Sequence, residues 1–407
     1  MKSIRKIDPP LWMTSPAVRV VYQALNTESS PQALFVGGAV RNMLRNEVAG
    51  DIDMATIHLP QEVQKRLEAI GVKVIPTGID HGTVTAVNQG QVIEITTLRR
   101  DVSTDGRRAV VAYTDDWQED ARRRDFTINT LLADIDGHIY DPLGEGLNDF
   151  VQGHVRFVGD ARARIAEDYL RILRYFRFQG LYGLGLPGAA TLAACAEAAP
   201  QMAYLSRERI THEMIKIAAF DNAADTISLM RAHGILKGIT SPAFDEDLLR
   251  EFCKRQIEQN QVDVVARLSI LLAFDIKRAE ERWALSTEQK RFIISMQRAA
   301  VLLEEPTAHK VHCSLYDEGL TVTVQALLLV FSKARLGKEQ EQPLIHEAMH
   351  WSVPAFPLQG HDVMALGVKQ GPVLGKLLAE VEAWWRASDF VPERTLCLQR
   401  LEELVSQ

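Results

Sequence analysis

The sequence predicts a mixed α/β (α+β) head of about 150 residues, followed by an elongated all-α body. From Ala33 to Gly153, short β-branched runs bounded by turn residues surround a helical segment. After Val158 strand signals nearly disappear, and helical patterning continues to the C-terminus. At 407 residues the chain is also too long for one compact core.

The head is predicted to contain an N-terminal helix and at least six strands. The helix begins at Ser15-Pro16, a capping residue followed by proline at the first helical position, and a second helix spans 39–48. The strands are expected at 33–36, 50–56, 72–76, 82–87, 91–98 and 138–142.

The chain is expected to divide into a head over 1–155, a helical neck over 156–240, and a helical body and tail over 241–407. Proline-rich segments at 240–247 and 352–362 are the best candidate joints between helical parts.

Composition indicates a soluble protein of a reducing compartment, the cytoplasm. Hydrophobic residues make up 46% and charged residues 24%, which excludes a disordered or collagen-like chain. The longest uncharged stretch, 178–196, is interrupted by Pro187, so no membrane span is expected. The 4 cysteines are widely spaced, without a CxxC pair, and residues 1–12 lack the apolar run of a secretory signal.

The formal net charge of −7 argues weakly against a nucleic-acid partner, but the charge is unevenly distributed. Between Val155 and Gly180 the sequence has six arginines and three acids, a local net charge of +3. The middle of the chain is therefore a candidate binding surface for phosphates.

The sharpest local signal is a glycine pair followed by a helix and two spaced aspartates. Gly37-Gly38 ends a predicted strand, and Asp51 and Asp53 lie two apart on the next strand, so their side chains share one face. Neighbouring carboxylates repel unless a cation lies between them, and hard oxygen ligands suit Mg²⁺. A glycine turn before a helix lets backbone amides approach a phosphate, and Arg41 can add a forked donor. An Asp-x-Asp alone is common on solvated strand edges.

The combined pattern resembles the head of the nucleotidyltransferase superfamily that includes DNA polymerase β. That resemblance implies a third carboxylate on a neighbouring strand, which completes a two-metal site. Glu94, between Ile93 and Ile95, is the candidate, although the same pattern also fits a residue facing water on a half-buried strand.

Three further segments narrow the family: HGTVT at 81–85, RRRDFTIN at 122–129 and AEDYLRILRYFRF at 166–178. With GGAVRN and DID they resemble class II tRNA nucleotidyltransferases and poly(A) polymerases, and specifically the CCA-adding enzymes. The resemblance covers residues 30–220 and continues weakly through 360–378. It implies template-independent addition of C, C and A to the tRNA acceptor end from CTP and ATP, with release of pyrophosphate by a Mg²⁺-dependent two-metal mechanism.

The resemblance also implies roles for individual residues. Asp51 and Asp53 match the metal ligands and, with Glu94, the catalytic carboxylates. The positions that match nucleotide-binding residues are Gly37, Gly38, Arg41, Arg124, Asp168, Arg171, Arg174 and Arg177, with Glu167 supporting Arg171. Asn42 departs from the usual aspartate of the first motif, which weakens any metal or ribose role for that position.

Residue chemistry supports a base-reading role for Asp168 and Arg171, which are expected three residues apart on one helix face. A carboxylate accepts from an exocyclic amino group, and a guanidinium donates to ring nitrogen and carbonyl acceptors. C and A both place an amino donor beside a ring-nitrogen acceptor, whereas U and G place a carbonyl beside an N–H. Arg177 is expected nearly opposite Asp168, where it has a structural role with acids of the head.

Residues 98–125 form an arginine- and acid-rich segment with a turn at Asp105-Gly106. It resembles the flexible loop with which complete CCA-adding enzymes switch from C to A, and it favours full CCA addition. The alternatives in the same family are a poly(A) polymerase and a partial CC- or A-adding enzyme.

Two alternatives come from other classes: a non-catalytic RNA-binding protein with a degenerate head, and a zinc protease. The protease hypothesis rests on the HExxH pattern at His346, Glu347 and His350. Pro354 follows soon after, so the preferred interpretation is two surface histidines on a helix.

Overall fold

The computed structural model describes residues 1–406 except 29, 48–50, 80–81 and 106–107, and the side chains of residues 101–111 are also outside its description. The chain forms two compact units, Met1–Ile239 and Thr240–Gln407. The boundary lies at the start of the proline-containing segment 240–247. The head and the first six helices after it, up to α10, pack within the first unit.

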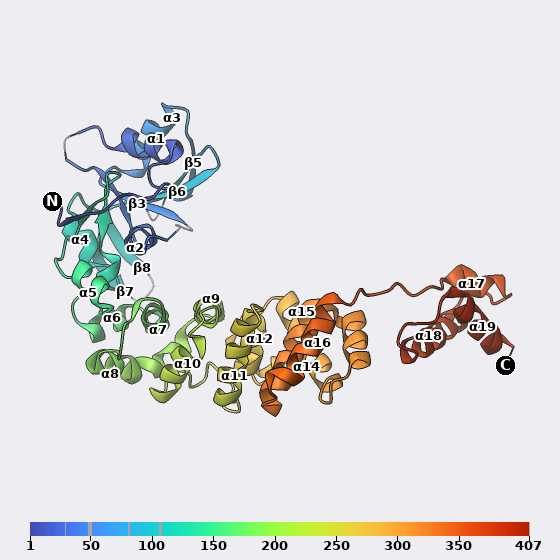
Figure 1. Cartoon of the computed structure of the whole chain (residues 1–407). Coiled ribbons are helices and arrows are strands. Elements are labelled where there is room, and N and C mark those ends of the chain that lie inside the picture. The colour runs from blue at the N-terminus through green and yellow to red at the C-terminus, as the bar shows by residue number, and fades with distance from the viewer. Residues whose placement is uncertain (29, 48–50, 80–81, 106–107, 407) are drawn as a thin grey trace. The chain divides into compact units, whose positions relative to one another are not determined.

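An eight-stranded sheet forms the head, in the order β1-β10-β9-β2-β3-β6-β5-β4 (Figure 1). β3 and β6 pair in parallel, and the other neighbouring pairs with a recorded register are antiparallel. The bounds are β1 Arg5–Lys6, β2 Ala33–Val36, β3 Ile52–Thr56, β4 Lys73–Gly78, β5 Thr83–Asn88, β6 Gln91–Thr97, β9 Leu132–Ala133 and β10 His138–Tyr140. All six predicted strands form. Sequence reasoning missed β1 and β9, because two-residue strands have no readable periodicity.

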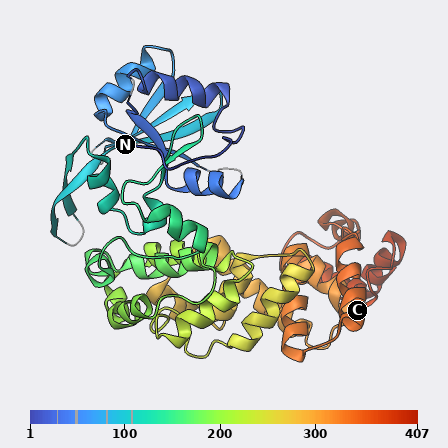
Figure 2. The ribbon, with the colours of Figure 1, turned by 60° about the vertical axis from the view of Figure 1, so that its left-hand side comes forward.

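Three helices pack their apolar sides against this sheet. They are α1 (Pro16–Leu25), α2 (Gly38–Arg45) and α3 (Pro60–Glu68), and Figure 2 shows α1 and α3 along one face of the sheet. Ser15 caps α1 as predicted: its hydroxyl accepts the Val18 amide at 3.4 Å. Val18, Val40 and Val63, one from each helix, join one core cluster with Phe35 and Met54 of the sheet.

Residues 98–125 are more regular than the predicted loop. They form an antiparallel hairpin of β7 (Arg99–Asp105) and β8 (Arg108–Tyr113), followed by α4 (Trp117–Arg122), and Figure 2 shows the hairpin projecting from the head sheet. The charge of the segment obscured the run Ala109–Val111, whose valines favour strand. Of the predicted turn, Gly106 lies outside the described residues.

Helices replace strands after β10, as predicted. In the described part of the chain no further strand follows β10, and Phe157 forms only an isolated bridge back to Phe126. The helices are α5 Gly146–Gln152, α6 Ala161–Glu167, α7 Leu170–Tyr182, α8 Ala189–Ala198, α9 Arg207–Ala218 and α10 Ala223–Ala232, with 3₁₀ turns at Thr127–Asn129 and Ala199–Tyr204. The rings of Phe126 and Phe178 lie 5.1 Å apart between centroids, so the aromatic side chains of α7 pack onto the segment that carries the RRRDFTIN motif.

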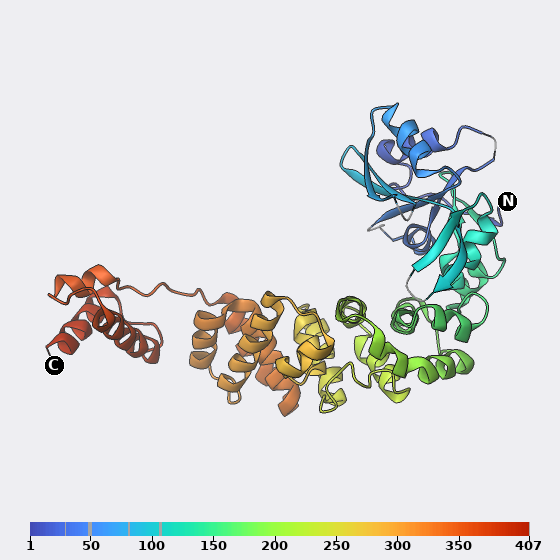
Figure 3. The same cartoon turned by 180° about the vertical axis from the view of Figure 1, so that it is seen from behind.

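The second unit is helical throughout its regular structure. Its helices are α11 Glu246–Glu258, α12 Val264–Leu271, α13 Ile276–Arg282, α14 Thr287–Leu302, α15 Ala308–Ala334, α16 Lys338–His350, α17 Gly360–Ala365, α18 Pro372–Ala387 and α19 Arg394–Val405. Figure 3 shows α14, α15 and α16 side by side, and these neighbours are in direct contact.

Among the described residues, α15 is the one helix long and apolar enough to cross a membrane by length and composition alone. Its most apolar stretch is 67% buried inside the protein, and a left-handed Gly319 (φ 81°) kinks it. Burial of this kind is what a core helix requires, and a membrane need not be invoked.

Candidate active site

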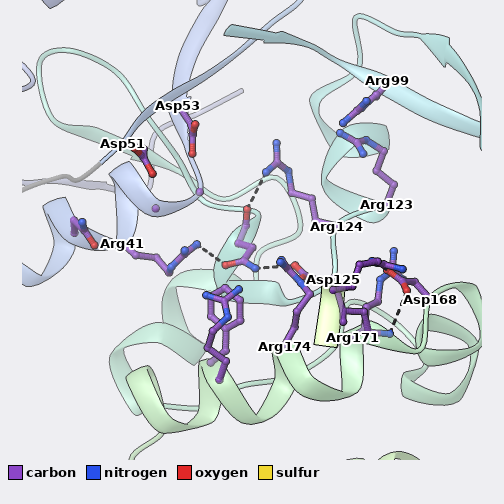
Figure 4. Close-up of a pocket in the computed structure, with 18 residues that line it drawn as sticks. Arg41, Asp51, Asp53, Arg99, Arg123, Arg124, Asp125, Asp168, Arg171 and Arg174 are labelled. Atoms are coloured by element: carbon purple, nitrogen blue, oxygen red, sulfur yellow. Dashed lines mark hydrogen bonds and ion pairs between the residues drawn. The ribbon is translucent and has the colours of Figure 1, made fainter. Parts of the chain in front are cut away.

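The predicted site residues converge on one cavity of about 730 Å³ in the first unit (Figure 4). Asp51 and Asp53 lie toward one side of the view, and Asp168 and Arg171 lie toward the other. All eight of the predicted nucleotide-binding residues line it, as do both predicted metal ligands; Glu94 and Glu167 do not. Most of the residues that line the cavity are therefore ones that the sequence predicts.

Gly37 forms the turn that leads into α2. Its backbone has φ 66° and ψ −124°, a conformation that strongly favours glycine, and a Cβ there would lie 3.8 Å from Oδ2 of Asp53. The turn therefore brings the N-terminus of α2 beside the carboxylates. Unpaired amides at a helix start attract anions such as phosphate.

The acidic side of the cavity is built on the parallel pair of strands. Asp53 of β3 is in register with Glu94 of β6, so their side chains share one face, and Asp51 immediately precedes β3. Burial, and then the charges of Glu94 and Asp51, raise the pKa of Asp53 to about 6. A divalent cation beside Asp53 would relieve this repulsion.

Arg41 lies beneath the carboxylates and is itself buried, 8% exposed. It donates to the side-chain oxygen of Asn129, and its guanidinium carbon lies 5.0 Å from the ring centroid of Phe178. Burial lowers the pKa of Arg41. The side chain is thus held rigidly where it lines the cavity.

Asn129 and Asp125 extend this contact toward α7. Asn129 donates to Oδ1 of Asp125 at 2.7 Å, and Arg174 of α7 donates to Oδ2 at 2.8 Å. Burial alone would raise the pKa of Asp125, but the charge of Arg174 and the hydrogen bonds outweigh it, so the pKa is lowered. Both residues belong to the RRRDFTIN motif, from which the sequence predicts no role for either.

Asp168 and Arg171 line the cavity, but they do not share one continuous helix as expected. Asp168 is the extended residue (φ −159°) at which α6 ends, and its Oδ1 accepts the Leu170 amide at 3.1 Å as α7 begins. An aspartate that accepts a backbone amide in this way favours a helix start over a helix interior. The chain therefore breaks between the two residues, and Arg171 lies in the first turn of α7.

Partners from neighbouring helices hold both of these side chains. Arg171 contacts Glu167, as predicted, and also donates to the carbonyl of Arg164 at 2.9 Å. Asp168 forms an ion pair with Arg209 of α9 at 2.7 Å. Arg209 gave no signal in the sequence because it belongs to an ordinary amphipathic helix more than 40 residues later.

Arg177 also lines the cavity, but the expected pairing with acids of the head is wrong. It forms a buried ion pair with Glu213 of α9 at 2.6 Å, where the two side chains are only 13% and 4% exposed. Arg177 pairs with Glu213 because α7 packs against α9. The periodicity of α7 alone does not predict this partner.

Replacement of Glu213 with alanine should therefore destabilise the first unit. The change leaves the Arg177 charge buried without its partner, which typically costs about 3–5 kcal/mol. Thermal unfolding measures the loss, and Glu208→Ala, an exposed acid on the same helix, is the matched control. Equal melting temperatures for the two variants would contradict the role of the ion pair.

The lining of the cavity is positively charged, whereas the chain as a whole is negatively charged. Its lining includes eight arginines against four aspartates, although the chain carries a net charge of −7. Besides the predicted arginines these include Arg99, Arg123 and Arg209. Such a wall suits a polyanionic ligand, with the acidic corner reserved for a cation.

The HExxH histidines do not form a comparable site. His346 and His350 are exposed and stack with 4.0 Å between ring centroids, whereas Glu347 contacts the buried His312 at 2.7 Å. Within the described residues no group of three or more His, Cys, Asp or Glu side chains is arranged to hold a metal ion, either here or around Asp53. Glu347 is thus already engaged, which leaves nothing to support protease chemistry.

Comparisons with known proteins agree with this site. Residues 33–156 match the poly A polymerase head domain, and residues 188–248 match a probable RNA and SrmB- binding site of polymerase A. The chain is 35% identical to the mitochondrial CCA tRNA nucleotidyltransferase 1 of Danio rerio, over 91% of this chain and 86% of that protein. It is 32% identical to the CCA-adding enzyme of Leuconostoc citreum, over 86% and 87%.

Among solved structures, the CCA-adding enzyme of Bacillus stearothermophilus in complex with CTP superimposes with a TM-score of 0.79 at 26% identity, covering 98% of this chain and 99% of that one. The sheet with its paired carboxylates and the helices that follow define a nucleotidyltransferase with a head of the DNA polymerase β type. More narrowly, the chain belongs to the family of CCA-adding tRNA nucleotidyltransferases.

Proposed function

We propose that this protein adds C, C and A to the 3′ end of tRNA, using CTP and ATP and releasing pyrophosphate, without a nucleic-acid template. The observation that carries the proposal is the shared cavity. Carboxylates suited to a metal ion and the Asp168–Arg171 pair suited to base edges line the same arginine-rich space. The names of the relatives support the same reaction.

Within this proposal each part of the chain has a task. Residues 1–155 bind the triphosphate and the metal, residues 156–240 select the base, and residues 241–407 hold the tRNA. The match of residues 188–248 to a probable RNA-binding site of polymerase A supports contact with RNA in the helical part, chiefly before residue 241. The solved Thermotoga maritima CCA-adding enzyme complexed with tRNA is 18% identical and shares the fold alone, with a TM-score of 0.70.

Asp51 and Asp53, with Glu94 in register beside them, are the residues that would hold Mg²⁺. The test of fit is the raised pKa of Asp53, which burial and the charges of Glu94 and Asp51 cause, because a divalent ion bound there would relieve that repulsion. When bound, the ion would activate the tRNA 3′-hydroxyl and polarise the α-phosphate. Arg41 and the amides at the start of α2 would hold the triphosphate and stabilise the leaving pyrophosphate.

Base selection follows from the donors and acceptors on Asp168 and Arg171. Although Asp168 already accepts from Leu170 and Arg209, a carboxylate has about four acceptor sites, so it can also accept an amino group. Arg171 is oriented by Glu167 and keeps donors for a ring nitrogen. Together they accept C and A and reject U and G.

A gel assay tests the function directly. A tRNA that ends at the discriminator base is incubated with CTP alone, with ATP alone, and with both. We expect an extension of two nucleotides with CTP, no extension with ATP, and three nucleotides with both. A long A tail would identify a poly(A) polymerase, and extension that stops after CC with both nucleotides would identify a partial enzyme.

We also infer a cytoplasmic location. The support is the state of the cysteines: Cys195, Cys253, Cys313 and Cys397 are all free, and three of them are buried. Such thiols suit a reducing compartment. The named relatives include both mitochondrial and bacterial proteins.

The raised pKa of Asp53 makes Mg²⁺ binding depend on pH. Between the ordinary value of 3.8 and about 6, the folded protein holds a proton here that the unfolded chain has lost. The metal-free protein therefore loses stability as pH rises through this window. A proton also competes with Mg²⁺ below about pH 6, so affinity should fall about tenfold per pH unit there.

The measurement is the Mg²⁺-induced rise in melting temperature across this range of pH. We expect a large rise near neutral pH and a small one at acid pH. In Asp53→Asn, which cannot ionise, the rise should be small at every pH. A wild-type rise that does not change with pH would contradict the assignment.

A further inference from the structure

Asp120 is a buried carboxylate of α4 to which the proposed reaction assigns no task. It is 3% exposed and does not line the cavity. We propose that Asp120 is a positioning residue for nucleotide binding, which holds Arg123 and Arg124 so that both guanidinium groups line the cavity. The inference rests on the proposed function in one respect, the assignment of this cavity to the nucleotide.

The first step is the contact between Asp120 and the two arginines. Oδ1 accepts from Nε of Arg123 at 2.8 Å, and Oδ2 accepts from Nε and Nη2 of Arg124 at 3.1 and 2.8 Å. The two bonds to Arg124 form a fork, which fixes the plane of the guanidinium as well as its position. The same grip leaves the other terminal nitrogen, Nη1, on the side away from Asp120, 3.4 Å from the Asn129 carbonyl.

The second step is the contact between Asp120 and the hairpin. Oδ1 also accepts the backbone amide of Arg99, at 3.3 Å, where β7 begins. The Arg99 side chain lines the cavity as well. The Asp120 carboxylate thus contacts three residues of the cavity wall: Arg99 at the start of β7, Arg123 at the end of α4, and Arg124 directly after it.

The third step is electrostatic. Arg123 and Arg124 are adjacent in sequence and face a cavity already rich in arginine, so they repel each other and their neighbours. Burial alone would raise the pKa of Asp120, but the charges of Arg124 and Arg123 outweigh it and the pKa is lowered. Asp120 therefore stays ionised behind the wall, where it offsets this repulsion without facing the ligand.

The test compares Asp120→Asn with Glu119→Gln. Glu119 is the neighbouring acid of α4, and it accepts from the Thr114 hydroxyl at 2.6 Å. Loss of the fork and of the buried charge should raise the KM for CTP and for ATP about tenfold in D120N, with kcat within about twofold of wild type. E119Q should keep both constants within about twofold of wild type.

A double-mutant cycle separates positioning from a general structural effect. If Asp120 acts in part through Arg124, KM in D120N/R124A should be well below the product of the two single effects. Multiplicative effects would overturn the proposal, as would an unchanged KM in D120N or an equal rise in E119Q.

Two further arms protect the test. If D120N fails to fold, Asp120→Glu replaces it, because glutamate keeps the charge but moves it by one methylene. This variant should raise KM by less than R124A does. No rise in KM at all would overturn the proposal. If the wild type adds neither C nor A, the proposed function fails. Equilibrium binding of CTP to wild type and D120N then decides this inference separately, with about tenfold weaker binding expected for the variant.

Discussion

Replacement of Asp53 with asparagine should abolish incorporation of both C and A while leaving tRNA binding intact. Asp53 is the half-buried member of the acidic corner, in register with Glu94 and beside the exposed Asp51. Asparagine keeps the size but removes the negative charge that a divalent ion requires. We expect single-turnover rates to fall by about 10³-fold or more, which corresponds to about 4 kcal/mol in activation free energy.

The control for this variant is Glu68→Gln, which removes an exposed carboxylate from α3. Rates of C and A addition should be indistinguishable from wild type in the control, and both variants should bind tRNA equally well in a filter or mobility-shift assay. Near-normal turnover by Asp53→Asn would refute the metal assignment. Loss of tRNA binding together with activity would point to a folding defect.

Replacement of Arg171 with alanine should weaken nucleotide discrimination as well as activity. Arg171 is the proposed donor to the ring nitrogen that C and A share, and each bidentate contact with a base contributes about 1–3 kcal/mol of discrimination. The ratio of kcat/KM for CTP over UTP, and for ATP over GTP, should therefore fall by about 5- to 150-fold.

Arg162→Ala is the matched control for Arg171→Ala. Arg162 lies on α6 and forms an exposed ion pair with Glu197 at 2.9 Å, with side-chain exposures of 61% and 67%. Its removal should change neither ratio. A uniform loss with all four nucleotides in Arg171→Ala would show that the arginine binds phosphate or maintains structure, and base reading would then need another residue.

The local patterns in the sequence were reliable where the chemistry depends on neighbours in the chain. The six expected strands form, and Gly37, Asp51 and Asp53 line one cavity, because a tight turn leads into α2 and Asp51 directly precedes the strand that carries Asp53. The family resemblance predicts Arg174 and Asp168 as site residues, and both line the cavity. Helical periodicity alone does not show which residues of distant segments come together. The mixed head, the helical body and the family are confirmed.

Errors arose where secondary structure depends on longer-range hydrogen bonding. The charged segment 98–125 forms a hairpin and a helix, because cross-strand pairing outweighs its loop-like composition. The break at Asp168 follows from a side chain that competes for a backbone amide. Neither outcome is visible in a count of charges or in helical spacing.

By itself the sequence determined the strand and helix pattern of the head, the Asp-x-Asp beside a glycine turn, and the membership of a family. These depend on backbone propensity and on motifs within short stretches of chain. The tertiary structure decided which charges face each other: Asp168 with Arg209, Arg177 with Glu213, and Asp120 with Arg123 and Arg124. The first two of these contacts depend on how helices far apart in sequence pack. Their partners lie outside the local sequence, so only the packing of the helices identifies them. The Asp120 pairs follow helical spacing, and the tertiary structure decides only that the carboxylate is buried behind the cavity wall.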